Sequence, residues 1–284
     1  MTTEPITVLG AGVMGVGITT LLAAHGLPVR LVDTAPEKLT QAPGRIRQEL
    51  RMAQLMGALP PGREQGEVTP HSDVAAVRGA RLVIEAITED TDLKKAVLSE
   101  VSALISPGTP MISNTSSIPI DELADAVRRP ADLIGTHFMN PPALIGTTEV
   151  IRGARTSEAT LDAVRGLLRE VGRRPVVVRD APGFVTSRLL HPMINDAARV
   201  VQEGTASVED VDALMQGCLG HPTGPLRTAD LIGIDNLVDS LWVLLKRTGD
   251  EGCRPCDLLL QKVADGHHGR KTGHGFYTYE ESAI

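Results

Sequence analysis

The feature that constrains the fold most is a glycine-rich turn close to the start of the chain. The run Ile6-Thr7-Val8-Leu9 predicts a strand, and Gly10-Ala11-Gly12-Val13-Met14-Gly15 leads from it into a helical pattern that reaches about Ala24. The first glycine permits a tight bend, the second lets a phosphate approach the backbone, and the third lets the helix pack closely on the strand. Amide groups at the helix N-terminus then bind the pyrophosphate of a dinucleotide. We therefore assign these residues to a cofactor site: Gly10, Gly12, Val13, Met14 and Gly15.

Asp33 indicates which dinucleotide this turn would bind. It ends the second predicted strand, Val29-Arg30-Leu31-Val32-Asp33. A carboxylate at this place accepts hydrogen bonds from a ribose diol and repels a 2′-phosphate. No Arg follows Asp33 directly to receive such a phosphate. The sequence therefore favours NAD over NADP, and Asp33 joins the cofactor site.

The rest of the first half alternates strand-like runs with helix-length spacers. The further runs are residues 82–85, 111–113, 133–136, 149–151 and 175–178, whereas residues 35–78 show no clear pattern. This alternation predicts a doubly wound α/β sheet whose parallel strands are joined by crossover helices.

The pattern changes after Asp180-Ala181-Pro182-Gly183. Strand-like runs stop, and helical patterns cover residues 186–201, 207–219, 231–245 and 255–264, with Ser207 as the expected N-cap of the second helix. A chain of 284 residues is long enough for two domains. We expect an α/β cofactor-binding domain over residues 1–183 and an all-helical domain over residues 184–284.

Composition argues against several classes of function. The formal net charge of −7 argues against binding to the phosphate backbone of nucleic acids, and an aromatic content of 2% argues against a stacking platform for single strands. No apolar run approaches the roughly 20 residues that a membrane span needs. The N-terminus lacks the basic start of a secretory signal, and three cysteines in this length are typical of a reducing compartment. We therefore expect a cytoplasmic protein with no membrane or nucleic-acid partner.

Polar residues gather at the ends of two later strands. Asn114-Thr115-Ser116-Ser117 follows one strand, and His137-Phe138-Met139-Asn140-Pro141 ends the next. Ligands of doubly wound folds bind at such strand ends. His137 can take and return a proton near neutral pH, and Glu149, at the start of another strand, can fix its tautomer. A single His at a strand end is usually structural, but His137 beside these groups and an NAD site indicates catalysis.

The chain resembles the short-chain L-3-hydroxyacyl-CoA dehydrogenase family, which includes bacterial 3-hydroxybutyryl-CoA dehydrogenases. The resemblance spans nearly the whole length and rests on ordered motifs: GAGVMG, EAITED with Lys94, NTSS, GTHFMNP, Glu149, PGFVTSRLL, GHPTGPLRTADLIGIDNL and GRKTGHGFY. It implies an N-terminal Rossmann-like domain and NAD-linked oxidation of a 3-hydroxyacyl thioester. It also implies that the helical domain over residues 184–284 serves substrate binding and forms a homodimer.

The resemblance implies roles for the residues at the strand ends. His137 would be the general base that removes the 3-hydroxyl proton as hydride leaves C3, and Glu149 would orient it. Ser116 and Asn140 would hydrogen-bond the reacting oxygen or the thioester carbonyl. Ser187 would also belong to the substrate site.

The resemblance implies further cofactor contacts as well. Glu89 and Lys94 would lie near the nicotinamide ribose, and Asn114 is assigned to the same site. The residues alone allow a plainer interpretation, in which Lys94 is a solvated helix charge beside Lys95. In the same interpretation, Glu85 and Glu89 form an acidic strand end.

Two departures from the family pattern bear on the substrate. Ser187 stands where the family usually has an active-site Asn before Arg-Leu-Leu, and Thr147 and Thr148 place two hydroxyls before Glu149. A plain acyl chain gains about 0.8 kcal/mol per buried methylene, so a polar wall suits it poorly. One hypothesis is therefore a small polar substrate, such as a glyceryl or seryl group on an acyl carrier protein in a polyketide-type pathway. The other is neutral replacement with the family's acyl substrate retained.

The carrier of the thioester is open between coenzyme A and acyl carrier protein. Arg45, Arg47 and Arg51 lie where the family meets coenzyme A. They can pair with its phosphates or with an acidic carrier helix. Alternatively, they form a solvated basic helix face with Glu49 between them.

Other interpretations remain beside this one. Cys253 and Cys256 have the spacing of a metal or redox pair, but they lack a second pair and a thioredoxin-like context, so no metal is expected. The β-hydroxyacid dehydrogenases share the glycine turn and a helical domain, but their catalytic Lys has no matching counterpart after residue 184 and they give His137 no role. A non-catalytic NAD-binding homologue is the third alternative, which Ser187 leaves open.

Overall fold

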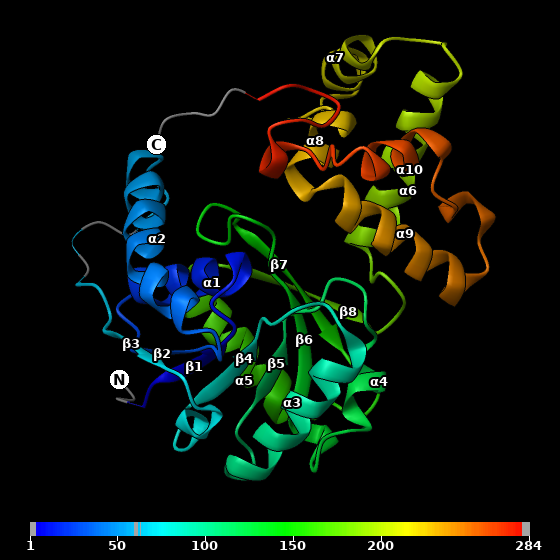
Figure 1. The fold of residues 1–284 in the computed structure, drawn as a ribbon. Helices are drawn as coiled ribbons and strands as arrows, with labels where there is room; N and C mark the ends of the chain where they lie inside the picture. Colours follow the sequence, from blue (N-terminus) through cyan, green and yellow to red (C-terminus); the bar gives the residue numbers. More distant parts are fainter. Residues whose placement is uncertain (1–3, 60–61, 63, 280–284) are drawn as a thin grey trace. The chain divides into compact units, whose positions relative to one another are not determined.

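The computed structural model describes residues 4–59, 62 and 64–279, and the chain divides into two compact units at residues 181 and 182. The first unit contains an eight-stranded sheet (Figure 1) in the order β3-β2-β1-β4-β5-β6-β7-β8. The strands are β1 (Ile6–Leu9), β2 (Val29–Val32), β3 (Val68–His71), β4 (Leu82–Glu85), β5 (Met111–Ser113), β6 (Leu133–His137), β7 (Thr147–Arg152) and β8 (Arg174–Arg179). The doubly wound α/β prediction is therefore confirmed.

One pair of strands departs from the parallel pattern. All neighbours in the sheet run parallel except β6 and β7, which pair antiparallel. Residues 138–146 join them, and this connection is shorter than the crossover of about a dozen or more residues that parallel pairing needs. The expectation of parallel strands throughout was wrong here. The reversal brings the start of β7 to the edge where β6 ends.

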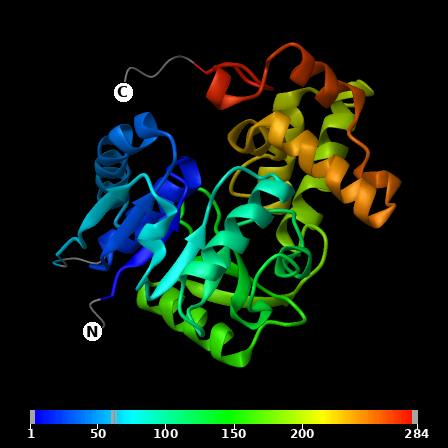
Figure 2. The same cartoon turned by 60° about the horizontal axis from the view of Figure 1, so that its bottom comes forward.

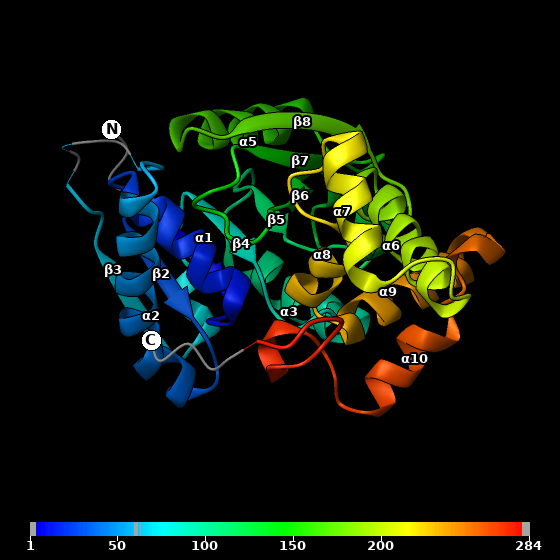
Figure 3. The ribbon, with the colours of Figure 1, turned by 90° about the horizontal axis from the view of Figure 1, so that it is seen from above.

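Helices cover both faces of this sheet (Figures 1 and 3). The helices α1 (Val13–Ala24), α2 (Pro36–Leu55) and α5 (Glu158–Glu170) share one aliphatic core with the central strands, whereas α3 (Thr91–Leu104) and α4 (Ile120–Ala124) pack on the opposite face. Phe138 is the one aromatic residue in that core among the described residues.

The segment without a clear pattern, residues 35–78, contains both α2 and β3. Helix α2 buries only Ala42, Ile46 and Ala53 and contains Pro43, so its apolar periodicity is weak. Strand β3 is an edge strand with Pro70 inside it, and Pro is tolerated in sheets mainly at such edges.

The second unit is mainly helical over its described residues and has two isolated β-bridges at His274 (Figure 2). Its helices are α6 (Thr186–Gln202), α7 (Val208–Leu219), α8 (Pro225–Ile232), α9 (Ile234–Thr248) and α10 (Asp257–Ala264). Ser207 caps α7 by accepting the N–H of Asp210, as its sequence predicts. The single helix expected over residues 231–245 is wrong, because Gly233 (φ 95°) separates α8 from α9. No helix among the described residues is long and apolar enough to cross a bilayer.

Candidate active site

Most predicted site residues of the first unit lie at one edge of the sheet, where its parallel strands end. Gly10, Asp33, Asn114 and His137 stand at or just after the carboxyl ends of β1, β2, β5 and β6. Glu149 lies near the start of the reversed strand β7, so it reaches the same edge. In open α/β sheets this edge is where ligands bind.

The glycine turn has the shape that a dinucleotide needs. Gly10 adopts φ 99°, and a Cβ there would lie 2.5 Å from the carbonyl oxygen of Ala86. A Cβ at Gly15 would collide with the carbonyl oxygen of Gly10, so α1 can begin this close to β1 only with glycine. Next to Gly12, by contrast, no described atom lies within 4 Å of the Cβ position. A pyrophosphate therefore has open access to the first amides of α1, at Val13 and Met14.

Asp33 is tied to this turn by hydrogen bonds. Its Oδ2 accepts the backbone N–H of Ala11 at 2.7 Å, and its Oδ1 accepts the N–H of Ala35 at 2.9 Å. Each carboxylate oxygen has more than one acceptor position, so a ribose diol can still be bound. Lys38 Nζ lies 3.9 Å from Oδ2. These residues fit the adenosine half of NAD.

His137 and Glu149 form a buried pair. They are directly opposite each other in the register of β6 and β7, and His137 Nδ1 lies 3.3 Å from Glu149 Oε2. Directly opposed side chains of an antiparallel pair lie on the same face of the sheet. Both residues are buried, with 9% and 6% of their surface exposed. A buried carboxylate beside one ring nitrogen can hold the imidazole in a single orientation.

The turn 114–117 is connected to the strand end that carries His137. Asn114 Oδ1 accepts the backbone N–H of Phe138 at 3.1 Å, and the N–H of Asn114 donates to the carbonyl of Glu85 at 2.8 Å. The Asn114 side chain thus fixes the distance between the serine turn and the backbone next to His137.

Glu89 holds the serine turn from the other side. Its Oε1 accepts hydrogen bonds from the hydroxyls of Thr115, Ser116 and Ser117 and from the backbone N–H groups of Ser116 and Ser117. Burial acts to raise the pKa of Glu89, but the charge of Lys94 and these hydrogen bonds outweigh burial and lower it. Glu89 is therefore an ionised acceptor.

Lys94 and Glu85 are not solvated. Both side chains are fully buried, and Lys94 Nζ lies 2.6 Å from Glu85 Oε1 and 3.3 Å from Glu89 Oε2. The plainer interpretation of Lys94 as a solvated helix charge is thus wrong. Glu85 does end β4 near Glu89, but its carboxylate is buried and paired with Lys94. Sequence reasoning gave Glu85 no function, although an acidic residue that ends the apolar run Leu82-Val83-Ile84 was a usable signal.

The segment after His137 is held by a residue that sequence reasoning missed. Asn140 is exposed in this segment. Arg173 Nε donates to the carbonyl of Pro142 at 3.2 Å and Nη2 to that of Ala143 at 2.8 Å. Burial lowers the pKa of Arg173. One arginine thereby ties the segment that contains Asn140 to the start of β8.

Of Thr147 and Thr148, only Thr147 lies on the same face of the sheet as Glu149. Successive side chains of a strand point to opposite faces, so Thr147 shares the face of Glu149 and Thr148 points the other way. Thr148 is also buried, with 1% exposure. The expectation that both hydroxyls lie beside the carboxylate was wrong for Thr148.

The three arginines of α2 have different surroundings. Arg45 is half-buried, and its Nη1 donates to the carbonyl of Ala11 in the glycine turn at 3.4 Å. Arg47 and Arg51 are exposed. Burial raises the pKa of Glu49, against the opposing influence of Thr20 and Arg45. The helix therefore offers one arginine to the cofactor turn and two to solvent.

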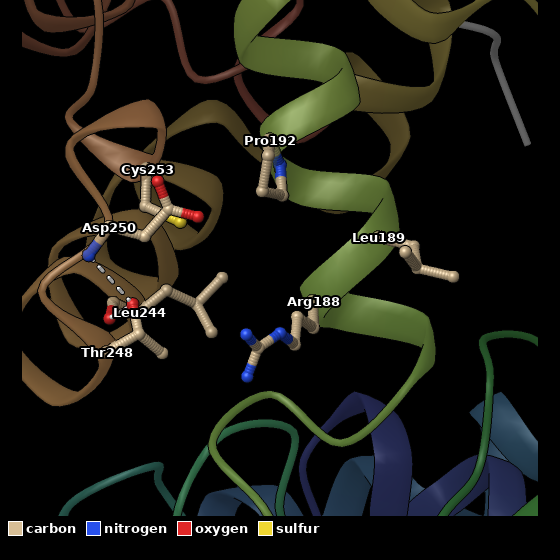
Figure 4. A pocket seen from close by; sticks show the side chains of 7 residues that line it. All are labelled: Arg188, Leu189, Pro192, Leu244, Thr248, Asp250 and Cys253. Atoms are coloured by element: carbon tan, nitrogen blue, oxygen red, sulfur yellow. Dashed lines mark hydrogen bonds between the residues drawn. The ribbon is translucent and has the colours of Figure 1, made fainter.

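In the second unit, Ser187 is buried in the first turn of α6. The neighbouring Arg188 points into a cavity of about 290 Å³ between α6 and α9, whereas Leu189 points away from it (Figure 4). Cys253 lines this cavity and is buried, as is Cys256. Burial raises the pKa of both thiols, which disfavours the thiolate that metal binding or redox chemistry needs.

Comparison with known proteins places the chain in a family. Its residues 5–181 match the family model "3-hydroxyacyl-CoA dehydrogenase, NAD binding domain", and residues 183–279 match "3-hydroxyacyl-CoA dehydrogenase, C-terminal domain". A "probable 3-hydroxybutyryl-CoA dehydrogenase" of Deinococcus radiodurans is 40% identical over 274 residues, covering 96% of this chain and 99% of its own.

Solved structures agree with this. FadB2 of Mycobacterium tuberculosis superposes with a TM-score of 0.92 at 35% identity, over 98% of this chain and 99% of that one. The (S)-3-hydroxybutyryl-CoA dehydrogenase PaaH1 of Ralstonia eutropha gives a TM-score of 0.88 at 35% identity, over 99% and 100% of the two chains. Together with the glycine turn and Asp33, these matches make the chain an NAD-dependent oxidoreductase that belongs to the 3-hydroxyacyl-CoA dehydrogenase family.

Proposed function

We propose that the chain interconverts a short 3-hydroxyacyl thioester and its 3-oxoacyl form, with His137 as the general acid–base group. The observation that carries this proposal is the buried pair of His137 and Glu149 at the sheet edge that also holds the glycine turn. NAD, when bound, would accept the hydride that leaves C3 of the substrate. The chain's own residues must then hold the substrate and move the hydroxyl proton.

His137 performs the proton transfer. Glu149 on Nδ1 sets the imidazole so that Nε2 accepts the proton of the 3-hydroxyl. The imidazolium that forms has Glu149 as a buried counter-charge, which stabilises the transferred state. In the reverse direction the same nitrogen returns the proton to the carbonyl oxygen.

Ser116 and Asn140 orient the substrate. The Ser116 hydroxyl lies 3.2 Å from Glu89 Oε1, a long contact that a substrate oxygen can replace. We assign Ser116 to the reacting oxygen and Asn140 to the thioester carbonyl. Lys94 and Glu89 would support the nicotinamide ribose, and Asn114 would fix the serine turn beside His137.

The two halves of the chain divide the work in this proposal. Residues 1–183 would bind NAD and carry the catalytic groups, and residues 184–284 would complete the substrate site and form the dimer. Ser187 would serve the substrate site from α6, with a shorter reach than an amide. Exposed apolar side chains of the second unit, such as Leu189 and Leu219, support a homodimer, and size-exclusion chromatography with light scattering would test it.

The first candidate substrate is 3-hydroxybutyryl-CoA, because relatives that match over nearly the full length are named 3-hydroxybutyryl-CoA dehydrogenases. The second candidate is a small polar hydroxyacyl group on an acyl carrier protein, and Thr147 on the face of Glu149 favours it. Steady-state rates with acetoacetyl-CoA and with a glyceryl-carrier substrate separate the two. A normal rate on acetoacetyl-CoA would reject the carrier-bound substrate as the specific one.

Replacement of His137 tests the mechanism. We expect His137→Gln to lower kcat by about 10²- to 10⁴-fold, the usual contribution of a general base, while NAD still binds. His71→Gln is a matched control, since His71 is a half-buried histidine of the edge strand β3. Unchanged turnover in His137→Gln would reject the assigned mechanism.

The compartment is the remaining part of the proposal. All three cysteines, Cys218, Cys253 and Cys256, are free thiols. Free thiols in a chain of this length are typical of the reducing cytoplasm. We therefore propose a cytoplasmic enzyme, which fractionation of the source cells would test.

A further inference from the structure

A row of three charges, Glu85, Lys94 and Glu89, links the end of β4 to the turn that carries Ser116, and the first two are fully buried. We propose that Glu85 is a positioning residue of the active site, which acts on Ser116 through Lys94 and Glu89. The proposal rests on the function proposed above, because that function assigns Ser116 to the reacting oxygen.

Glu85 is the most firmly fixed residue of this row. It is the last residue of β4 and has no exposed surface. Its Oε1 accepts hydrogen bonds from Lys94 Nζ at 2.6 Å and from the backbone N–H of Ile87 at 2.9 Å, and its Oε2 accepts the Ser113 hydroxyl at 2.6 Å. A buried carboxylate is tolerated only when its lone pairs are satisfied, and these donors satisfy it on both oxygens. Glu85 therefore stays in place and fixes the ammonium group of Lys94.

Lys94 transmits that position to Glu89. The ammonium group lies between the two carboxylates, 2.6 Å from Glu85 and 3.3 Å from Glu89. Its side chain is fully buried, so water does not compensate for a lost partner. If Glu85 loses its charge, Glu89 is the charged partner that remains for Lys94 among the described residues. The ammonium then moves toward Glu89 and pulls on it.

Glu89 passes the movement to Ser116. The contact of Glu89 Oε1 with the Thr115 hydroxyl is short, at 2.6 Å, whereas that with the Ser116 hydroxyl is 3.2 Å. A shift of Glu89 changes the weaker contact most. To donate a hydrogen bond to a substrate carbonyl, the Ser116 hydroxyl must break its hydrogen bond to Glu89. Glu85 thus sets how readily Ser116 is released to the substrate.

A double-mutant cycle separates this role from a purely structural one. Glu85→Gln keeps the shape of the side chain and removes its charge. We expect kcat to fall by about 10- to 100-fold, the effect of misplacing a positioned group. The Kd for NAD should rise by a smaller factor, because the glycine turn and Asp33 hold the rest of the dinucleotide and are untouched. In a Ser116→Ala background the same change should alter kcat by less than about twofold, because its target is gone. An equal fall in both backgrounds would overturn the proposal.

Further variants keep the test decisive. Ser113→Ala removes one donor to Glu85 without removing a charge, and we expect a fall in kcat of about threefold that also disappears in Ser116→Ala. This cycle decides the question if Glu85→Gln does not fold. Asp132→Asn is the matched control, since Asp132 is a buried carboxylate with an arginine partner just before β6, at the end of that strand opposite His137. Its kcat should stay within about twofold of the parent, because it contacts no group of the row.

The failure of this inference differs from failure of the proposed function. Suppose that Ser116→Ala and His137→Gln each lose activity, but Glu85→Gln lowers kcat equally in the parent and in the Ser116→Ala background. Only the positioning role of Glu85 is then rejected. If Ser116→Ala and His137→Gln both retain full kcat, the proposed function is rejected, and the role of Glu85 with it.

Discussion

Gly17 of α1 packs directly against Pro142 in the segment that follows His137. A Cβ at position 17 would lie 2.7 Å from Cδ of Pro142 and 3.1 Å from its Cγ. Such distances are far shorter than the ordinary contact of about 3.5–4.0 Å between carbon atoms. The helix that begins at the glycine turn therefore also sets the position of the segment with Asn140.

Gly17→Ala should displace that segment. We expect a loss of about 1–3 kcal/mol in the free energy of unfolding from overpacking, and a fall in kcat of about tenfold as Asn140 moves. Urea unfolding and steady-state kinetics measure the two effects. Gly166→Ala in α5 is the control, because no described atom lies within 4 Å of its Cβ position, and it should stabilise the protein by about 0.5–1 kcal/mol. Normal kinetics in Gly17→Ala would show that the segment adapts.

Replacement of Asp33 should weaken the preference for NAD. Asp33→Ala removes the ribose acceptor and releases the N–H of Ala11, which now donates to Oδ2. We expect the Kd for NAD to rise by about tenfold or more, which corresponds to about 1.4 kcal/mol, and the ratio of activity with NADP to that with NAD to increase. Isothermal titration and kinetics with both cofactors check this. An unchanged ratio would mean that Asp33 does not discriminate at the 2′ position.

Sequence alone predicted the motifs of this site better than the contacts between them. The glycine turn and Asp33 are local features, and a strand with a glycine-rich end has few alternative structures. The burial of Lys94 is different, because Asp92 and Lys95 beside it make its helix look solvated. Only the pairing of Lys94 with Glu85 and Glu89 reveals that it is buried.

The same distinction applies to the strands. The runs at β1, β4 and β6 are continuous and apolar, and periodicity finds them. Strand β3 at the edge is only half-buried, so it carries little apolar signal. The reversal of β7 follows from the length of the connection before it, and that reversal is what places Glu149 opposite His137.

The low pKa of Glu89 predicts an effect on stability in acid. Burial opposes the shift, but Lys94 and the hydrogen bonds of the serine turn lower the pKa below its ordinary value of 4.5. A carboxyl whose folded-state pKa is lowered stabilises the protein fully above the unfolded value and loses this contribution as the pH falls through the folded value. The difference in unfolding free energy between the parent and Glu89→Gln should therefore shrink from pH 5 toward about pH 3. A difference that is constant over this range would contradict the assignment.

Tyr279 predicts the opposite behaviour at high pH. Its hydroxyl donates to Asp230 Oδ2 at 3.0 Å, and burial together with the charge of Asp230 raises the pKa of Tyr279 to about 12. In the unfolded chain this phenol ionises near its ordinary value of 10.0, so unfolding releases a proton above that pH. The stabilisation is therefore complete below pH 10 and is lost as the pH rises toward 12. Tyr279→Phe should lose less stability than the parent between pH 10 and pH 12, and thermal unfolding at pH 9, 10 and 11 would measure this.

Tyr277 also has a raised pKa, through burial and its bond to Asp212, so the single variant should reduce the alkaline loss without abolishing it. Equal slopes in parent and variant would show that Tyr279 ionises alike in the folded and unfolded chains.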